Sequence, residues 1–304
     1  MRCISSLLPA AVPAAALILA AVSAHAAPID QTVPAKPDGD VHVSNVAGSV
    51  TVSVWDRNEV HVGGTLGRDA ERVAVDTSGG GVDIRVVLPR NGRDHNIEGS
   101  DLTVQLPAGS HVSVETVSAD VTATGLTGMV QLQTVSGDVE LRSKAADITA
   151  KSVSGDVRID GAAPQARVEA HSISGDVRLD SVDGELYAES VSGDIELDGT
   201  NTLKRCRFNT TSGSVDFRAA LSAEGDCEFH SVSGDVTLDL PEAPNARFNV
   251  ETFSGDIHST FGPTPQRKSE YGPGKSWRYQ ASSGSARFDI NTMSGDIRLS
   301  APKP

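Results

Sequence analysis

The sequence predicts an all-β protein folded as a parallel β-solenoid of about eleven coils, with repeats of 18 to 21 residues. A motif of the form Val-Ser-Gly-Asp-Val recurs along the chain and begins at positions 135, 153, 173, 191, 232, 253 and 293. Between Ala119 and Gly255 the motif centres follow one another at steps of 18 to 21 residues. Apolar residues recur two positions apart on both sides of each centre, which is the period of a strand with one buried face.

The motif centre defines position 0 of each coil, and weaker matches bring the predicted centres to Gly48, Gly80, Ala119, Gly137, Gly155, Gly175, Gly193, Gly213, Gly234, Gly255 and Gly295. Apolar residues occupy positions −7 and −5 before the centre and +2 and +4 after it. Each coil is therefore expected to hold two short strands joined at the motif. Such a unit buries its apolar face only by stacking on its neighbours, and parallel connections wind in a right-handed sense by default.

The motif is expected to form the corner between the two strands. Position −3 carries a hydroxyl residue in nearly every coil, and position −2 carries an apolar residue, most often valine. We expect both side chains to point inward, because the strand alternation slips here, and we expect the glycine to supply the backbone freedom of the bend. The serines at −1 have no histidine at a fixed distance, which argues against a Ser-His-Asp site.

Four segments are expected along the chain. Residues 1–26 hold an arginine, an apolar run and Ala-His-Ala, which is the pattern of a secretory signal peptide. Residues 27–38 contain three prolines and are expected to be a flexible leader. Residues 39–110 match the repeat loosely and are expected to form an N-terminal β region of irregular coils and a cap. Residues 111–304 are expected to form the regular solenoid, with an insertion at about 259–281.

Charge and hydropathy restrict the location and the partners. The formal net charge of −14 disfavours nucleic acids and anionic membrane surfaces. After the signal peptide, no stretch is long and apolar enough to span a bilayer, so no transmembrane anchor is expected. The protein is therefore expected to be exported, and to lie in the periplasm or at the cell surface or outside the cell.

Aspartates at position +1 are expected to form a column along the corner, at Asp120, Asp138, Asp156, Asp176, Asp194, Asp235, Asp256 and Asp296. Stacked coils would place them about 4.8 Å apart, where two charges in water repel by about 0.9 kcal/mol. One interpretation is a row of calcium ions between the carboxylates. The other, which we favour, is that each carboxylate faces solvent or accepts a backbone N–H at the corner, so that no metal site is present.

Two cysteines, Cys206 and Cys227, both occupy position −7 in consecutive coils. Stacking would bring them within reach of a disulfide, and an exported protein meets an oxidising environment. Two buried thiols that act as small apolar side chains are the alternative.

The insertion holds the one basic and aromatic cluster of an acidic chain, with candidate binding residues Tyr271, Trp277, Arg278 and Tyr279. Exposed aromatic residues stack on sugars or anchor protein partners, which suggests a binding loop. Alternatively, Trp277 and Tyr279 alternate along a returning strand and cover the edge of the solenoid.

Several segments together resemble a known family: VHVSNVAGSVTVSVWDRNEVHV, DLTVQLPAGSHVSVETVSADV, the serial SGD[VI] coils and FDINTMSGDIRLS. They are similar to the DUF4097 family of exported bacterial β-strand-repeat proteins, and the resemblance covers nearly all of the chain after residue 26. It implies the solenoid fold and an adhesin-like role. Some relatives are linked to envelope-stress systems, but this chain differs in its aromatic insertion and in the expected lack of a membrane anchor.

The expected function is that of a non-enzymatic structural or adhesin-like protein of the bacterial envelope, with no cofactor or catalytic residues and with an envelope protein or a carbohydrate as partner. One alternative is a periplasmic component of envelope-stress signalling that binds a partner protein. A polysaccharide-cleaving enzyme is a further alternative, and it would need a groove lined by unpaired carboxylates. Because few residues follow the last coil of the sequence, end-to-end self-association is also expected.

Overall fold

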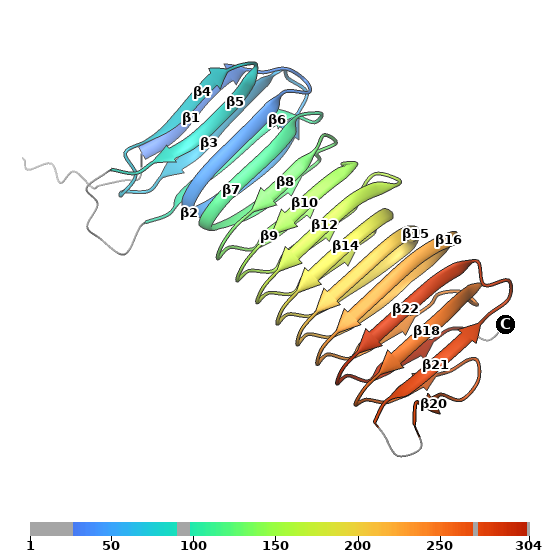
Figure 1. Ribbon diagram of the computed structural model, residues 1–304. Coiled ribbons are helices and arrows are strands. Elements are labelled where there is room, and N and C mark those ends of the chain that lie inside the picture. The colour runs from blue at the N-terminus through green and yellow to red at the C-terminus, as the bar shows by residue number, and fades with distance from the viewer. Residues whose placement is uncertain (1–26, 90–97, 270–272, 303–304) are drawn as a thin grey trace, which may run out of the picture.

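The computed structural model describes residues 27–89, 98–269 and 273–302, which form one elongated β-solenoid (Figure 1). The described residues form strands and turns without any helix, and successive coils pair in parallel. The predicted fold class is therefore confirmed. The expected signal peptide lies outside the described residues, and no described segment is a helix able to cross a membrane.

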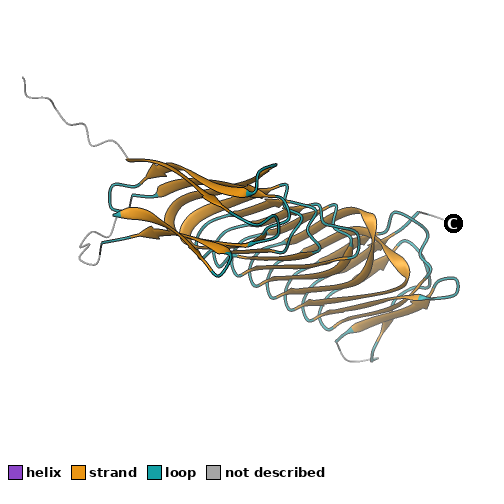
Figure 2. Cartoon of the chain, turned by 90° about the horizontal axis from the view of Figure 1, so that it is seen from above, coloured by secondary structure: helices purple, strands orange, loops and turns teal. Residues whose placement is uncertain are grey.

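Two facing rows of strands run along the regular part of the solenoid, whose coils follow one another along one axis (Figure 2). Strands that precede the corner are β8 (Val130–Gln133), β10 (Asp147–Lys151), β12 (Ala166–Ser172) and β14 (Gly184–Ser190). Strands that follow it are β9 (Val139–Arg142), β11 (Val157–Asp160) and β13 (Val177–Asp180). Two longer strands, β15 (Ile195–Thr210) and β16 (Val215–Ser231), contribute to both rows. Paired residues share the same coil position, as in Val157 opposite both Val139 and Val177.

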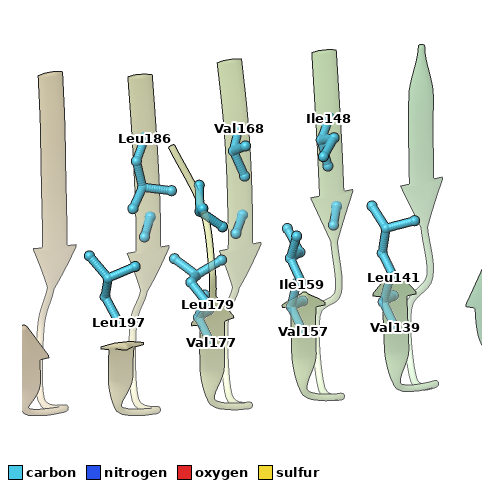
Figure 3. Close-up of a cluster of buried hydrophobic side chains, with 14 of the residues drawn as sticks. Val139, Leu141, Ile148, Val157, Ile159, Val168, Val177, Leu179, Leu186 and Leu197 are labelled. Atoms are coloured by element: carbon cyan, nitrogen blue, oxygen red, sulfur yellow. The ribbon is translucent and has the colours of Figure 1, made fainter. Parts of the chain in front are cut away.

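The core lies between the two rows and consists of the predicted apolar ladders (Figure 3). Ile148, Val168 and Leu186 at position −7 are 0 to 3% exposed, and the residues at +2 and +4 that face them are equally buried. Full burial of such a side chain contributes about 1.5 to 3 kcal/mol. A single coil leaves both flanks of its two strands open to solvent, so most of this free energy is gained only when coils stack.

The N-terminal end combines parallel coils with antiparallel pairs, and its strands are β1 (Ala27–Pro34), β2 (Asp40–Trp55), β3 (Glu59–Leu66), β4 (Arg72–Ser78), β5 (Gly81–Val87), β6 (Ser100–Pro107) and β7 (His111–Thr124). Strands β2 and β7 pass through their motifs without a break and pair in parallel, with Gly48 opposite Ala119. Antiparallel pairing joins β1 to β3, β3 to β6 and β4 to β5.

Two expectations for this end are wrong. Residues 27–34 are strand β1 rather than part of a flexible leader, because all eight residues pair with β3 and Ile29 reaches the core. Gly80 is no corner either, because it lies in the turn between the antiparallel strands β4 and β5 with a φ of 91°. The other ten predicted centres belong to the stacked coils.

The C-terminal end departs from sequence order. Its strands are β17 (Val236–Asp239), β18 (Ala246–Thr252), β19 (Ile257–Ser259), β20 (Gln266–Arg267), β21 (Lys275–Gln280), β22 (Ala286–Thr292) and β23 (Ile297–Ser300). The last coil of the sequence lies inside the stack, with β22 between β16 and β18 and β23 between β17 and β19. Strand β21 then pairs antiparallel with β18, and β20 pairs with β21. The premise of end-to-end association is therefore wrong, because the insertion and not the last coil lies at this end.

The corner glycines are required for a different reason from the one expected. None of the eight glycines that follow Ala119 in the column has a positive φ, so none needs glycine's backbone freedom. A Cβ atom on any of them would instead lie 1.7 to 2.1 Å from the carbonyl oxygen of the preceding corner. Successive corners approach so closely that no side chain fits between them, and this close approach explains the invariant centre of the repeat.

Replacement of one corner glycine by alanine is expected to destabilise the whole solenoid. In Gly175→Ala the new Cβ would lie 2.1 Å from the Gly155 oxygen, and because both partners are backbone the coils must separate. Overpacking of this kind costs about 1 to 3 kcal/mol or more. Urea unfolding of the variant measures this loss. The matched control is Gly199→Ala, where the nearest atom would lie 3.7 Å away; equal stability of the two variants would contradict the account.

Candidate functional site

The corner is joined from coil to coil by buried hydroxyl groups. The Ser172 hydroxyl accepts the N–H of Gly175 in its own coil at 2.9 Å and donates to the Gly155 oxygen of the preceding coil at 3.0 Å. Ser152 and Ser190 make the same two hydrogen bonds in their coils. The expectation that position −3 points inward is confirmed. These hydroxyls are part of the packing, and their burial makes them unavailable to a ligand.

The aspartates at +1 form a second set of contacts between coils. One oxygen of Asp138 accepts the amide N–H of Asp156 at 2.9 Å, and one oxygen of Asp156 accepts that of Asp176 at 2.8 Å. A hydrogen bond to a charged acceptor contributes about 1.5 to 3 kcal/mol, which exceeds the repulsion of about 0.9 kcal/mol between neighbouring carboxylates. The structure thus has the backbone arrangement that we favoured over calcium. Within the described residues no three acidic, His or Cys side chains are grouped to hold a metal ion.

The side chains at position −2 point outward, and the expectation that they point inward is wrong. They form an exposed row along the corner, here called the apolar stripe: in spatial order Val117, Val135, Val153, Ile173, Val191, Val232, Met293 and Phe253, each 38 to 59% exposed. Thr211 fills the same position between Val191 and Val232. The physical reason is that position −3 keeps the inward direction for the hydroxyl contacts, so its neighbour turns to the opposite side. Backbone hydrogen bonds such as Ser174 N–H to Val153 oxygen, at 2.9 Å, fix the row.

The apolar stripe concentrates most of the exposed hydrophobic surface. In the described part of the chain nine large apolar side chains are exposed, and eight of them belong to the stripe; the ninth is Met129. Scattered single residues of this kind are normal on a protein surface, whereas a continuous row marks an interaction site. The stripe is therefore the candidate functional site.

The environment of the aspartates changes along the stripe. In the C-terminal coils Arg298 pairs with Asp235 at 2.9 Å and with Asp296 at 3.2 Å, and Lys275 pairs with Asp256. The Arg298 guanidinium and then the amide N–H of Asp296 hold the pKa of Asp235 below its usual range. In the five coils from Ala119 to Gly193 no Lys, Arg or His of the described residues lies within ion-pair distance of the aspartate at +1.

The predicted aromatic insertion does not form an open binding loop. Trp277 is 2% exposed, its indole N–H donates to the Pro263 oxygen at 2.7 Å, and its ring packs against Phe248 and Phe261. The proposal that it contacts a carbohydrate or partner is therefore wrong, because its place is in the core at the end of the solenoid. Tyr279 is half-buried beside it.

Arg278 and Tyr271 are the other two candidate binding residues. Arg278 is exposed, but its guanidinium donates to Glu251 at 3.0 Å and to Asn249 at 3.1 Å. The ammonium of Lys268, and then Arg278, keep the pKa of Glu251 below its ordinary value. Tyr271 lies outside the described residues. The structure thus brings Trp277, Arg278 and Tyr279 together on β21, where Trp277 is buried and the other two line a surface hollow.

A shallow hollow of about 640 Å³ lies on the outer face of β10, β12, β14, β15 and β16. Its glutamates are each paired with an arginine: Glu169 with Arg167, Glu185 with Arg205 and Glu228 with Arg207, at 2.6 to 3.2 Å. Asp226 keeps one buried oxygen without a hydrogen-bond partner. A glycosidase needs two free carboxyl groups about 5 to 10 Å apart, so these paired acids argue against glycan cleavage in the hollow.

The two cysteines at −7 are joined in a disulfide. Cys206 lies opposite Cys227 in the parallel pairing of β15 and β16, with their Cα atoms 4.5 Å apart. Both are at most 1% exposed, so the disulfide fastens two coils from inside the core. A cross-link over about 20 residues stabilises a protein by roughly 3 kcal/mol in the loop-closure model.

Removal of one corner hydroxyl should destabilise the fold more than removal of an exposed one. Ser172→Ala leaves the buried N–H of Gly175 and the oxygen of Gly155 without this partner, at a cost of about 1 to 3 kcal/mol. Ser174→Ala, at the exposed position −1, is expected to change stability by less than about 0.5 kcal/mol. Thermal unfolding compares the two, and Ser172→Thr should restore stability because threonine occupies this position in other coils.

Loss of Trp277 tests whether that residue is structural. Trp277→Ala is expected to lower the free energy of unfolding by about 3 to 5 kcal/mol, because it removes a buried aromatic side chain from the end of the core. Arg278→Ala, which breaks only exposed contacts, should cost less than about 1 kcal/mol. Denaturant unfolding measures both; unchanged stability of Trp277→Ala would restore the binding-loop interpretation.

The fold and the corner define an elongated β-solenoid repeat protein with an exposed apolar row that only Thr211 interrupts. More particularly, the chain belongs to the Toastrack DUF4097 family, whose model matches residues 90–231 and 216–300. No curated protein matches the chain.

Solved structures that match the chain come from several bacteria. One, from Parabacteroides distasonis, is described as a "putative lipid binding protein"; it is 14% identical, with a TM-score of 0.45, and the match covers 90% of this chain and 96% of that one. Another, from Bacteroides fragilis, is described as a "putative adhesin"; it is 13% identical, with a TM-score of 0.38, and covers 90% and 97%.

Proposed function

We propose that this chain is an exported, non-enzymatic binding protein of the bacterial cell envelope, and that the apolar stripe is its contact surface. The observation that carries the proposal is the stripe itself, in which eight of the nine exposed large apolar side chains of the described residues stand in one row. Each of them remains in water although the hydroxyl residue directly before it is buried. Burial of this surface against a partner would gain about 25 cal/mol per Å² of apolar area.

The geometry of the row supports binding rather than catalysis. The same side chains recur at the same position in coil after coil, whereas a catalytic site needs one arrangement that differs from its surroundings. Stacking also makes the row rigid, because each backbone corner is hydrogen-bonded to the next. A rigid surface loses little conformational entropy on binding, which favours affinity.

The location of the protein decides between two forms of this function. Protease digestion on intact cells would favour an adhesive role at the surface. Protection until the outer envelope is opened would favour a periplasmic role, in which the stripe binds a partner protein of the envelope.

Polar replacement of the stripe tests the proposal directly. The triple variant Val135→Ser, Val153→Ser and Ile173→Ser changes only exposed side chains, so the fold should persist. We expect its retention by the isolated envelope fraction to fall at least about tenfold, which corresponds to a loss of about 1.4 kcal/mol. Co-sedimentation with envelopes from the source cells measures this.

The matched control is Met129→Ser, which removes an equally exposed apolar side chain outside the stripe and should bind like the unchanged protein. Full retention of the triple variant, with its melting curve unchanged, would contradict the proposed contact surface.

A further inference from the structure

The five consecutive coils centred on Ala119 to Gly193 combine two features that no other part of the corner combines. Their apolar side chains at −2 are 38 to 48% exposed: Val117, Val135, Val153, Ile173 and Val191. Their aspartates at +1 are exposed too, and no cation of the described residues lies within ion-pair distance of them. A row of apolar groups therefore runs beside a row of uncompensated negative charges.

Only one of the two oxygens of each carboxylate in this segment accepts a hydrogen bond from the described residues. One oxygen of each aspartate accepts an amide N–H of the next coil, as Asp120 does from Asp138 at 3.0 Å. The second oxygen makes no hydrogen bond within the described residues. In the C-terminal coils, by contrast, Arg298 contacts the second oxygens of Asp235 and Asp296, and Lys275 pairs with Asp256. The contrast shows that cations fit at this position of the corner, and that the first five coils leave it open.

We infer that these five coils bind an amphipathic basic helix of a partner protein, with the helix axis along the apolar stripe. The inference rests on the proposed function and names the class of partner. The apolar face of the helix would cover the stripe, while lysine or arginine side chains on one flank would reach the free oxygens of the aspartates. Complementary charge of this kind sets both the orientation and the specificity of docking.

The spacing of the coils favours a helix over an extended strand. Five coils about 4.8 Å apart span about 19 Å, which corresponds to about 13 residues of helix. Side chains one helical turn apart are separated by about 5.4 Å. In a helix centred on the stripe, the side chains at either end would therefore lie only about 1.2 Å beyond the outermost stripe residues. Alternate residues of a strand are about 6.8 Å apart. The outermost side chains of a strand centred on the stripe would therefore lie about 4 Å beyond the outermost stripe residues, which is nearly the height of one coil.

Charge argues against the other occupants. An anionic bilayer would meet the carboxylates of the corner at close range, and a second copy would bring the same uncompensated row and the same net charge of −14. A basic helix is the occupant that relieves the repulsion between the aspartates.

The test uses the folded chain and a labelled 15-residue helical peptide with leucines on one face and lysines along one flank. Fluorescence anisotropy should show binding that weakens as salt rises from 50 to 300 mM. The triple variant Asp138→Asn, Asp156→Asn and Asp176→Asn removes the charge and keeps an oxygen for each backbone N–H, and its melting curve is measured alongside because hydrogen bonds to a neutral amide are weaker. We expect it to weaken binding about tenfold and to flatten the salt dependence.

The control for charge is a variant that removes three exposed carboxylates elsewhere: Asp38→Asn, Glu71→Gln and Asp76→Asn. It should bind like the unchanged chain. Equal weakening in this control would mean general attraction to an acidic protein and would overturn the inference. Equal affinity for a peptide with glutamates in place of lysines, or no binding of the lysine peptide at 1 mM, would do so as well.

Further outcomes identify a different occupant. Binding to vesicles of phosphatidylglycerol, or self-association lost in the triple serine variant, would each overturn the inference in favour of a membrane or a second copy. If the serine variant loses envelope binding while the asparagine variant keeps both envelope and peptide binding, the proposed function stands and the basic partner is wrong. If neither variant loses envelope binding, the proposed function fails as well.

Discussion

The close approach of successive corner backbones is the constraint on which the rest of this structure depends. A Cβ atom at any glycine centre after Ala119 would lie about 2 Å from a carbonyl oxygen of the neighbouring coil. The same approach lets a buried hydroxyl bridge two coils and lets each aspartate accept an amide N–H from the next. Glycine, hydroxyl and carboxylate therefore act together, and most coils carry all three because each contact uses the backbone of a neighbour; Ser214 replaces the carboxylate in one coil and Ala119 replaces the glycine in another.

As a consequence of this arrangement, the valine at position −2 of the motif cannot point into the core. The corner directs the hydroxyl at −3 inward and the carboxylate at +1 toward the adjacent coil, which leaves the side chain at −2 facing solvent. Stability alone would tolerate a polar residue there, as Thr211 demonstrates. Exposed apolar residues nevertheless occupy this position in eight coils, and the cost of exposing them suggests that the surface is used.

Much of the fold could be predicted from the sequence, because period-two ladders at −7, −5, +2 and +4 require stacked parallel strands. What could not be predicted depends on contacts between distant segments. The place of the last coil between β16 and β18 follows from how the insertion folds back, and the pairing of residues 27–34 with β3 overrides two prolines. The stripe was visible in the sequence as a recurring apolar position. Strict alternation from −7, −5 and −3 places it outward, whereas its apolar character led to the expectation of a slip that would turn it inward. Trp277 was a candidate binding residue because it lies among polar and basic neighbours; the alternative expectation, a returning strand that covers the edge of the solenoid, is the arrangement that the structure has.

Pairs of cysteines placed along the stripe test the central claim, that the motifs of successive coils stack at one outward-facing corner. With Cys3 replaced by serine, Val153→Cys with Ile173→Cys joins adjacent coils about 4.8 Å apart, whereas Val153→Cys with Val191→Cys spans two coils, about 10 Å. Cα atoms more than about 7 Å apart cannot form a disulfide without backbone movement. The account predicts rapid cross-linking of the first pair under mild oxidation and none of the second, which mass spectrometry of peptides resolves. Thiols that remain inaccessible to reagents in the folded protein, or equal cross-linking of both pairs, would contradict it.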